Sequence, residues 1–318
     1  MKIAILGATS HIAKNLIYYF LKDSRYKLFL FSRRNESVHA FLVPLEKATI
    51  PTVQSYDGFS LEEYDAIINC VGIADPRKQK ADPYESFLVT ERFDNLTIDY
   101  IKAHKGCRYI NFSSGAVFGT EFQEPVGDNS TATFRPNALG TADCYRIAKL
   151  NAETKHRCLS DLPIVDIRVY SFFSRYIDLD AGFMLSEAAR CILDGRPFRT
   201  NASEIVRDYI APNDLFSFVS RILAGGPANA VVDMRSTRPV RKSELLESLA
   251  KNFGLVIEMM YCDIQTVSGM KSEYYSTSGQ AESLFGFEPT CNALKCVGTE
   301  MEALLACAGR TMESGMRP

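Results

Sequence analysis

Short apolar runs alternate with longer segments of helical periodicity along most of this chain. Residues 2–6 and 27–31 are nearly continuous apolar runs, which is typical of strands buried on both faces of a parallel sheet. Further short runs that we interpret as strands lie at 52–56, 65–72, 107–112 and 163–170. Helical patterns follow, as in residues 84–104. This alternation predicts an α/β fold, with a Rossmann-type doubly wound parallel sheet and helices on both faces.

The second half of the chain is expected to form a smaller α/β part that binds substrate. Its clearest element is an amphipathic helix at 243–253, which begins at Ser243 and stops at Gly254. The predicted domains are residues 1–170 for the dinucleotide and 171–307 for the substrate, with part of 205–235 returning to the first domain. Residues 308–318 are polar and contain glycine, which predicts a frayed tail.

Small or charged residues follow five of the predicted strands: Gly7, Arg33, Asp57, Gly72 and Ser114. Ligands of open parallel sheets bind outside the carboxyl ends of the strands. All five residues should therefore lie along one edge of the sheet, and this convergence predicts the functional site.

A glycine turn, Gly-Ala-Thr-Ser-His-Ile-Ala over residues 7–13, follows the first strand. Gly7 allows a tight turn, and the amides that open the next helix can hold a diphosphate. Ser10 and Ala13 stand where a dinucleotide-binding turn usually has its second and third glycines, and both are small. An ordinary strand-to-helix turn is the alternative. The candidate cofactor contacts here are Gly7, Thr9, Ser10, His11 and Ile12.

The end of the second strand bears on the choice of cofactor. NAD sites usually place an acidic residue here for the ribose hydroxyl, whereas an arginine accommodates the 2′-phosphate of NADP. The chain has Arg33 and Arg34, and no acidic residue before Glu36. We therefore favour NADP(H) over NAD(H); a solvated basic loop is the alternative. Further cofactor contacts are expected from other strand ends, at Asp57, Gly58, Cys70, Val71, Gly72 and Tyr170.

Two tyrosine–lysine pairs, Tyr145–Lys149 and Tyr18–Lys22, have the spacing that places both side chains on one helix face. An ammonium near a phenol favours its ionised form, and such a phenol can exchange a proton with a substrate alcohol or carbonyl. Tyr18 lies in an apolar helix with no serine-rich strand end before it, so we interpret it as packing. Tyr145 comes after the strand that ends at Ser114, so Ser114, Tyr145 and Lys149 form the predicted catalytic set.

Composition limits the partners. The chain has 318 residues and a formal net charge of −2, so no general attraction to nucleic acid or anionic membranes is expected. No apolar run approaches the roughly twenty residues that span a bilayer. The nine cysteines are odd in number, and none has zinc-ligand spacing with a histidine partner. We expect reduced thiols, no metal site and a cytoplasmic protein.

Together, these motifs make the chain resemble the extended short-chain dehydrogenase/reductase family, whose best-known members are nucleotide-sugar epimerases, dehydratases and reductases. Five motifs occur in the family's order. They are the turn Gly7–Ala13, the strand end Ser113–Gly119, the pair Tyr145–Lys149, the segment Arg207–Ile210 with Asp214, and the closing segment Leu284–Thr290.

The resemblance implies a role for each site residue. Tyr145 would be the acid/base, Lys149 would bind the nicotinamide ribose and lower the pKa of Tyr145, and Ser114 would hold the substrate oxygen. Arg207 would pair with the substrate diphosphate, a bidentate role suited to guanidinium. Ser171 stands where the family often has a substrate-binding asparagine. The alternatives are a helix-capping hydroxyl for Ser114 and a surface ion pair for Arg207.

Gly115 and Ala116 stand where the family's dehydratases have acidic residues, so dehydration is disfavoured and Gly115 is left as a substrate contact. What remains is reduction of a carbonyl or oxidation of an alcohol, or epimerisation through a transient ketone. Because Arg33 favours NADP(H), the first hypothesis is an NADPH-dependent reductase of a nucleotide-linked 4-keto sugar in bacterial surface-polysaccharide synthesis, with Tyr145 as proton donor. An NAD(P)-dependent nucleotide-sugar C4 epimerase is the alternative, and a non-catalytic NADP(H)-binding sensor is a third hypothesis. The resemblance also implies a homodimer.

Overall fold

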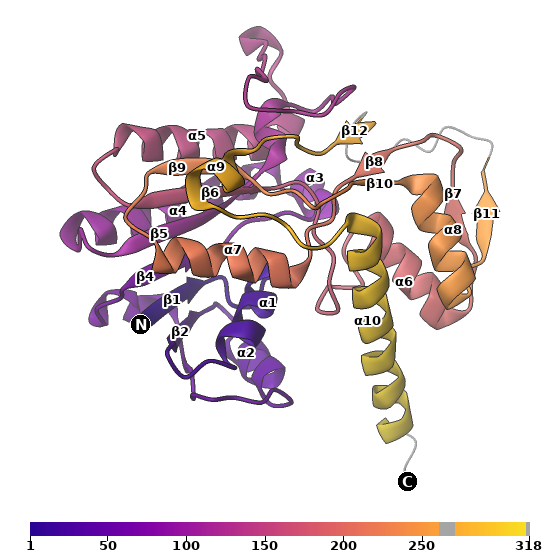
Figure 1. Ribbon diagram of the computed structural model, residues 1–318, viewed down its shortest axis with the longest axis horizontal. Coiled ribbons are helices and arrows are strands. Elements are labelled where there is room, and N and C mark those ends of the chain that lie inside the picture. Colours follow the sequence, from indigo (N-terminus) through magenta and orange to yellow (C-terminus); the bar gives the residue numbers. More distant parts are fainter. Residues whose placement is uncertain (261–270, 316–318) are drawn as a thin grey trace.

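A seven-stranded parallel sheet forms the centre of the protein, in the order β3-β2-β1-β4-β5-β6-β9 (Figure 1). The computed structural model describes residues 1–260 and 271–315. The strands are β1 (Lys2–Leu6), β2 (Lys27–Phe31), β3 (Thr52–Gln54), β4 (Ala66–Asn69), β5 (Arg108–Ser114), β6 (Ile164–Val169) and β9 (Ala230–Asp233). The order reverses between β1 and β4, which is where dinucleotides bind in such sheets. The predicted Rossmann-type fold is confirmed.

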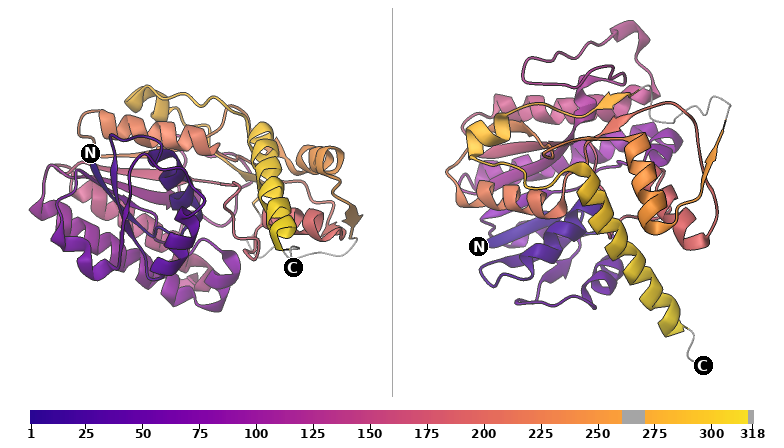
Figure 2. Two further views of the ribbon diagram at one scale, coloured as in Figure 1. Left: turned by 90° about the horizontal axis from the view of Figure 1, so that it is seen from below. Right: turned by 45° about the vertical axis from the view of Figure 1, so that its right-hand side comes forward.

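Successive side chains of each central strand enter two different cores, because strand residues alternate between the faces of a sheet. Ile3 and Ile5 pack with α1 (His11–Phe20), α2 (Asn35–Leu42) and α7 (Pro212–Ala224) on one face. Ala4 and Leu6 pack on the other face, which α4 (Pro83–Ala103) covers. Helix α5 (Cys144–Cys158) lies beside α4. Figure 2 shows helices on both sides of the sheet.

The rest of the chain forms a smaller part with its own apolar core. This core joins α6 (Met184–Asp194), α8 (Lys242–Phe253) and α10 (Ala293–Gly315). Two small sheets complete it, one of β8 (Val206–Arg207), β10 (Val240–Arg241) and β12 (Glu273–Tyr274), the other of β7 (Phe198–Thr200) and β11 (Ile257–Met259). The short helices elsewhere are η1 (Tyr56–Leu61), α3 (Pro76–Ala81), η2 (Gly115–Phe118), η3 (Pro136–Ala138), η4 (Thr141–Asp143) and α9 (Gln280–Phe285).

Several boundaries differ from those expected. β3 stops at Gln54, because Tyr56 already opens η1. Within 205–235, α7 packs on α1 and β9 extends the central sheet. Helix α10 continues to Gly315 and projects from the body of the molecule, so residues 308–315 of the expected frayed tail are helical (Figure 1). Residues 316–318 of that tail lie outside the described residues.

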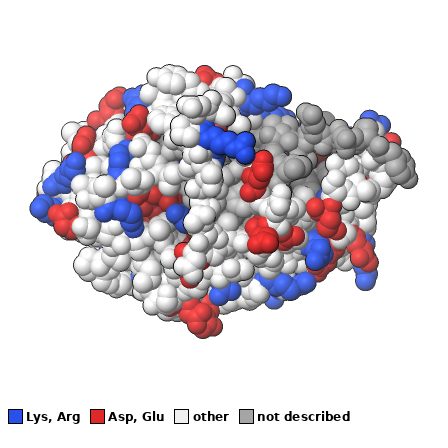
Figure 3. Space-filling view, turned by 90° about the horizontal axis from the view of Figure 1, so that it is seen from above, with Lys and Arg blue, Asp and Glu red and all other residues white. Residues whose placement is uncertain are grey.

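The surface shows mixed charge. On the face in Figure 3, basic and acidic side chains are interspersed, in keeping with the net charge of −2. Within residues 1–260 and 271–315, no helix combines the length and apolar character needed to cross a bilayer.

Candidate active site

The predicted catalytic serine and tyrosine meet at the carboxyl edge of the sheet. Ser114 is the last residue of β5, and Tyr145 lies in the first turn of α5. Their side chains are hydrogen-bonded to each other. Ser114 Oγ also accepts a hydrogen bond from the Ala116 amide at 3.2 Å, which caps η2. Capping therefore fixes the serine hydroxyl in place without excluding its contact with Tyr145.

Lys149 lies one helical turn beyond Tyr145 and is buried. Its Nζ donates a hydrogen bond to the carbonyl oxygen of Phe112 at 2.7 Å. A Cβ atom placed on Gly72 would lie 3.5 Å from the same Nζ, so the lysine reaches the end of β4. Burial lowers the pKa of Lys149, and the nearby carboxylates of Asp94 and Asp166 oppose that shift.

The expected effect of Lys149 on Tyr145 is not found in this structure. Burial raises the pKa of the Tyr145 phenol, and its hydrogen bond with Ser114 offsets only part of that rise. In the second tyrosine–lysine pair the two side chains do bond to each other, because Lys22 Nζ donates to the Tyr18 hydroxyl at 2.7 Å in an exposed position. Spacing along a helix therefore allows a tyrosine–lysine bond but does not determine where one forms.

A third hydroxyl reaches the same place from the C-terminal part. The Tyr274 hydroxyl on β12 lies 3.3 Å from Ser114 Oγ. Its ring packs 5.2 Å from the Tyr170 ring and 4.8 Å from the Phe122 ring, measured between centroids. Burial raises the pKa of Tyr274. Sequence reasoning missed this residue, because it lies in no motif and follows Ser114 by 160 positions.

Tyr170 covers the backbone at Gly115. A Cβ atom on Gly115 would lie 2.2 Å from the Tyr170 ring, so no larger residue fits in this arrangement. The Tyr170 hydroxyl donates to Asp233 Oδ2 at 2.9 Å. This contact supplies a packing reason for the glycine, which stands where an acidic residue would serve dehydration.

The dinucleotide turn has the backbone geometry that the sequence predicts. Gly7 has φ of +75°, which favours glycine, and a Cβ atom there would lie 3.0 Å from the carbonyl oxygen of Cys70. Its amide lies 3.1 Å from both the Phe31 carbonyl oxygen and the Tyr56 hydroxyl. Ser10 caps α1 by accepting from the Ala13 amide at 3.3 Å. The turn therefore leads into the helix start that could hold a diphosphate.

The other predicted residues of this turn face the protein. His11 Nε2 lies 2.7 Å from Ser174 Oγ, and burial lowers the pKa of His11 to about 3, so the ring is neutral. Ile12 packs against the core beside β1. Thr9 is half-buried. Cys70, at the end of β4, is hydrogen-bonded to Ser10, and Val71 donates its amide to Asn69 Oδ1 at 3.0 Å.

Arg33 and Arg34 are exposed beyond the end of β2. Ser32 is buried, and its Oγ accepts from the Arg34 amide at 3.0 Å, which fixes the turn. Neither arginine has an ion-pair partner among the described residues. Asp57 and Gly58 lie in η1, and the charge of Arg33 opposes the burial that raises the pKa of Tyr56, the first residue of that helix.

Two of the four predicted substrate residues, Ser171 and Arg207, belong to the second part of the chain. Ser171 accepts from the Ile210 amide at 3.3 Å through its backbone. Arg207, on β8, donates from Nη1 to the carbonyl oxygens of Val206 and Lys271, at 2.8 and 2.7 Å. It forms no ion pair with a described residue, so the alternative of a surface ion pair is not what this structure has.

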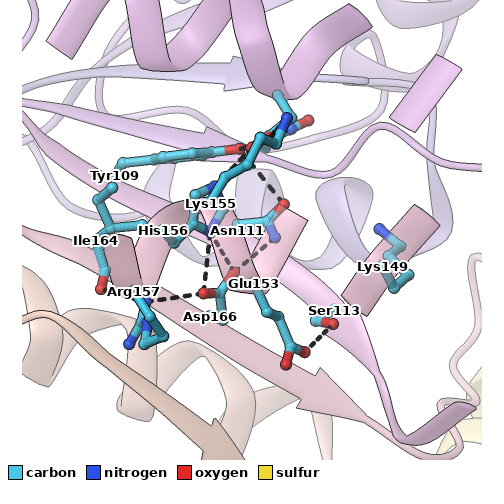
Figure 4. Close-up of polar contacts among 12 residues, drawn as sticks. Tyr109, Asn111, Ser113, Lys149, Glu153, Lys155, His156, Arg157, Ile164 and Asp166 are labelled. Carbon is cyan, nitrogen blue, oxygen red and sulfur yellow. Dashed lines mark hydrogen bonds and ion pairs between the residues drawn. The ribbon is translucent and has the colours of Figure 1, made fainter. Parts of the chain in front are cut away.

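A buried ionic cluster lies between α4, α5 and β6, further along α5 than Lys149 (Figure 4). His156 Nδ1 lies 2.8 Å from Asp166 Oδ1, and His156 Nε2 lies 2.6 Å from Asp94 Oδ1. Lys155 and Arg157 pair with the outer oxygens of the same carboxylates. Burial alone would lower the pKa of His156, but the hydrogen bonds to Asp166 and Asp94 raise it to about 9.

Glu153 anchors the neighbouring part of α5. Its carboxylate accepts from Ser113 Oγ at 2.5 Å and pairs with Arg168 at 2.6 Å. Arg168 also reaches Asp233, at 3.3 Å. Sequence reasoning missed Glu153, although it lies four residues after Lys149 on the same helix face.

The fold and this site define a Rossmann-fold protein in which Ser114, Tyr145 and Lys149 lie together at the carboxyl edge of the sheet. Over residues 3–233 the chain matches the NAD dependent epimerase/dehydratase family, and it belongs to that family. The resemblance to extended short-chain dehydrogenases/reductases is thereby confirmed. Comparison with the curated proteins by sequence finds no match.

Solved structures of this class superpose on nearly the whole chain. UDP-glucuronic acid 4-epimerase from Bacillus cereus, in complex with UDP-glucuronic acid and NAD, has a TM-score of 0.76 at 15% identity and covers 96% of this chain and 100% of its own. UDP-glucose-4-epimerase from Stenotrophomonas maltophila, with NAD and formylated UDP-arabinopyranose, has a TM-score of 0.81 at 13% identity, with 98% and 99% covered. A dTDP-glucose 4,6-dehydratase from Bacillus anthracis, with NAD, has a TM-score of 0.74 at 15% identity, with 95% and 96% covered. At these identities the likeness shows the fold.

Proposed function

We propose that this protein is an NAD(P)-dependent enzyme that acts on a nucleotide-linked sugar, and that it epimerises the sugar at C4. One observation carries the proposal. The hydroxyls of Ser114 and Tyr145 are hydrogen-bonded at the carboxyl edge of the sheet, one helical turn from Lys149, whose Nζ lies beside Gly72, just after β4. The structural similarity to two sugar-nucleotide 4-epimerases supports C4 as the position.

The residues present fit a nicotinamide dinucleotide. The order reversal between β1 and β4, the turn at Gly7 and the small residue Gly72 beside Lys149 leave backbone accessible at the cofactor's expected place. When bound, the cofactor supplies a hydride acceptor and donor. Lys149 would hold its ribose, and the amides at the start of α1 would hold its diphosphate.

The chain's own residues then handle the proton. Tyr145 accepts the proton of the sugar hydroxyl during oxidation and returns it during reduction, while Ser114 donates a hydrogen bond to the same oxygen. The positions after Ser114, Gly115 and Ala116, carry no acid or base that could expel water. Epimerisation needs no such acid or base, because the same carbon is oxidised and then reduced on its opposite face.

A second candidate is NADPH-dependent reduction of a 4-keto sugar, and Arg33 and Arg34 favour it. Both are exposed where a 2′-phosphate would lie, and Ser32 replaces the acid of NAD sites. The same observation leads us to propose NADP(H) as the cofactor, although the compared structures contain NAD. We further propose a cytoplasmic homodimer.

The deciding experiment supplies UDP- and dTDP-linked glucose and galactose, and separately their 4-keto-6-deoxy derivatives, with NAD, NADP or NADPH. Epimerisation predicts interconversion of the hexoses with no net change in cofactor absorbance at 340 nm. Reduction predicts stoichiometric loss of NADPH with the keto sugars only. No conversion in either series would overturn the proposal and favour the non-catalytic sensor.

A further inference from the structure

Arg146 directly follows Tyr145 in the sequence, and its side chain is buried. Its guanidinium pairs with Asp143 at 2.6 Å, and the two side chains are only 10% and 14% exposed. The guanidinium carbon also lies 4.3 Å from the centroid of the Phe134 ring. Burying a charge costs free energy unless the charge is paired and hydrogen-bonded, so these contacts hold the guanidinium in one place.

The ion pair holds the start of α5, where no side chain caps the helix. Asp143 accepts from Arg146 Nε at 2.6 Å with one oxygen and from the Gly140 amide at 2.8 Å with the other. Burial would raise the pKa of Asp143, but these two hydrogen bonds lower it below its ordinary value, so the carboxylate stays ionised. Helix ends without a cap fray, and this pair therefore takes the place of a cap in the turn that carries Tyr145.

Arg146 also reaches the short helix that Ser114 caps. That helix, η2, begins directly after Ser114 and is followed by Gly119. A Cβ atom placed on Gly119 would lie 3.8 Å from Arg146 Nη1, and η2 packs against α5. One side chain therefore contacts both the end of η2 and the first turn of α5, and these are the elements that position Ser114 and Tyr145.

The segment between η2 and α5 is anchored by the same side chain. Residues 128–142 are mostly exposed and project from the body of the molecule (Figure 1). Among the described residues, the polar and ring contacts that 131–140 makes outside itself go to Asp143 and Arg146. The order of this segment and the position of Tyr145 therefore depend on one guanidinium.

We propose that Arg146 is a positioning residue, which holds the Tyr145 hydroxyl against Ser114 for proton transfer. The inference rests on the proposed function for the reaction that this proton transfer serves. Loss of the guanidinium would release the first turn of α5 from η2, and the two hydroxyls would separate. A small displacement of a catalytic group costs roughly tenfold to a hundredfold in rate. Lys149 and the Gly7 turn, which would hold the cofactor, lie outside these contacts.

The first test uses the NMR signal of tyrosine labelled with carbon-13 at Cζ, which needs no turnover. The signal that is absent from Tyr145→Phe belongs to Tyr145, and Ser114→Ala shows the position of that signal without the serine hydrogen bond. Arg146→Ala should move the signal most of the way to that position. Arg190→Ala is the matched control, because it breaks a more exposed pair, with Asp180 in the second part of the chain, and it should leave the signal in place.

The second test is kinetic. Arg146→Ala should lower kcat about tenfold or more, while the dissociation constant of the cofactor stays within about twofold. Arg146→Lys keeps a charge for Asp143 but lacks the planar fork, so it should recover part of the lost rate. Phe134→Leu, in the projecting segment, removes the ring from the guanidinium and should cause a smaller shift of the Tyr145 signal in the same direction.

An unmoved Tyr145 signal in folded Arg146→Ala would overturn the inference, and if that variant does not fold, an unmoved signal in Phe134→Leu would do so. A loss of cofactor affinity as large as the loss in kcat would also overturn it, because the side chain would then support the fold as a whole. If the Tyr145 signal moves as expected and wild-type protein converts no sugar, the inference stands and only the proposed function fails.

Discussion

The Nε2 atom of His156 lies 2.6 Å from Oδ1 of Asp94, in a part of the core where neither side chain is more than 1% exposed. The opposite nitrogen lies 2.8 Å from Asp166 Oδ1. Both ring nitrogens can donate to carboxylates only when the imidazole is protonated. His156 is therefore a buried cation that joins α5, the helix that also carries Tyr145 and Lys149, to α4 and to β6.

This histidine should make stability fall in mild alkali. Its pKa is about 9 in the folded protein and about 6.5 when unperturbed. Because the folded value is the higher one, the stabilisation is complete below pH 6.5 and is lost as pH rises through 9. The loss is on the order of 3 kcal/mol. Urea unfolding at pH 6.5 and 9.0 should show this decline in wild-type protein and a smaller one in His156→Gln. Parallel profiles for the two proteins would show that the histidine does not titrate in this way.

Tyr145→Phe should lose turnover by about a hundredfold to ten-thousandfold, because the proton donor and acceptor is removed. Cofactor affinity should stay within about twofold, since Lys149 and the Gly7 turn are untouched. Steady-state kinetics and cofactor titration measure the two effects. Tyr18→Phe is the matched control, because it removes the phenol of the other tyrosine–lysine pair. Equal losses in both variants would reject the assignment of Tyr145.

The sequence alone predicted those elements and residues whose position depends on the local pattern of side chains. Buried apolar runs predicted the sheet strands, and the end of each strand predicted the edge where Ser114 and Gly72 lie. The position of strand ends also predicted that Ser114 and Tyr145 meet, since Ser114 ends β5 and Tyr145 lies in the first turn of α5.

The residues that sequence reasoning missed arrive through long-range pairing. Tyr274 reaches Ser114 because β12 pairs with β8, and no periodic signal in the sequence spans that separation. The His156 cluster likewise draws on α4, α5 and β6, whose register only the packed fold defines. The burial that raises the pKa of Tyr145 likewise depends on packing, which the spacing of Tyr145 and Lys149 along the sequence does not reveal.

Replacing Arg33 and Arg34 by alanine should weaken NADPH binding about tenfold and change NADH binding less than about twofold, since only NADPH carries the 2′-phosphate that an arginine accommodates. Fluorescence titration with each cofactor measures the ratio. Arg25→Ala, at the other end of β2, is the control, because that exposed arginine pairs with Asp23. Equal weakening of both cofactors would mean that the arginines do not read the phosphate.

Glu153→Gln should destabilise the fold by roughly 3–5 kcal/mol, because it leaves the largely buried guanidinium of Arg168 with only its longer contact to Asp233. Glu258→Gln removes a similar pair with Arg199, but both of those side chains are well exposed, so the cost should be under about 1 kcal/mol. Chemical denaturation compares the two variants. A comparable small effect for both would show that the buried pair adds no more than a surface one.

Gly115→Ala should impair both stability and activity, because the new methyl group would lie 2.2 Å from the Tyr170 ring. The ring cannot retreat freely, since its hydroxyl is held by Asp233 at 2.9 Å, so overpacking should cost about 1–3 kcal/mol. The shift would also disturb Ser114, the preceding residue.

Gly298→Ala is the control, because that glycine lies within α10 with open space where a Cβ atom would be added, and the change should stabilise the helix by about 1 kcal/mol. Relative to wild type, the unfolding temperature should therefore fall in Gly115→Ala and rise in Gly298→Ala. Only the Gly115 variant should lose turnover. A Gly115→Ala protein as stable and active as wild type would show that Tyr170 can leave Gly115 at little cost, and that the aromatic cover over the catalytic serine is not a fixed part of the site.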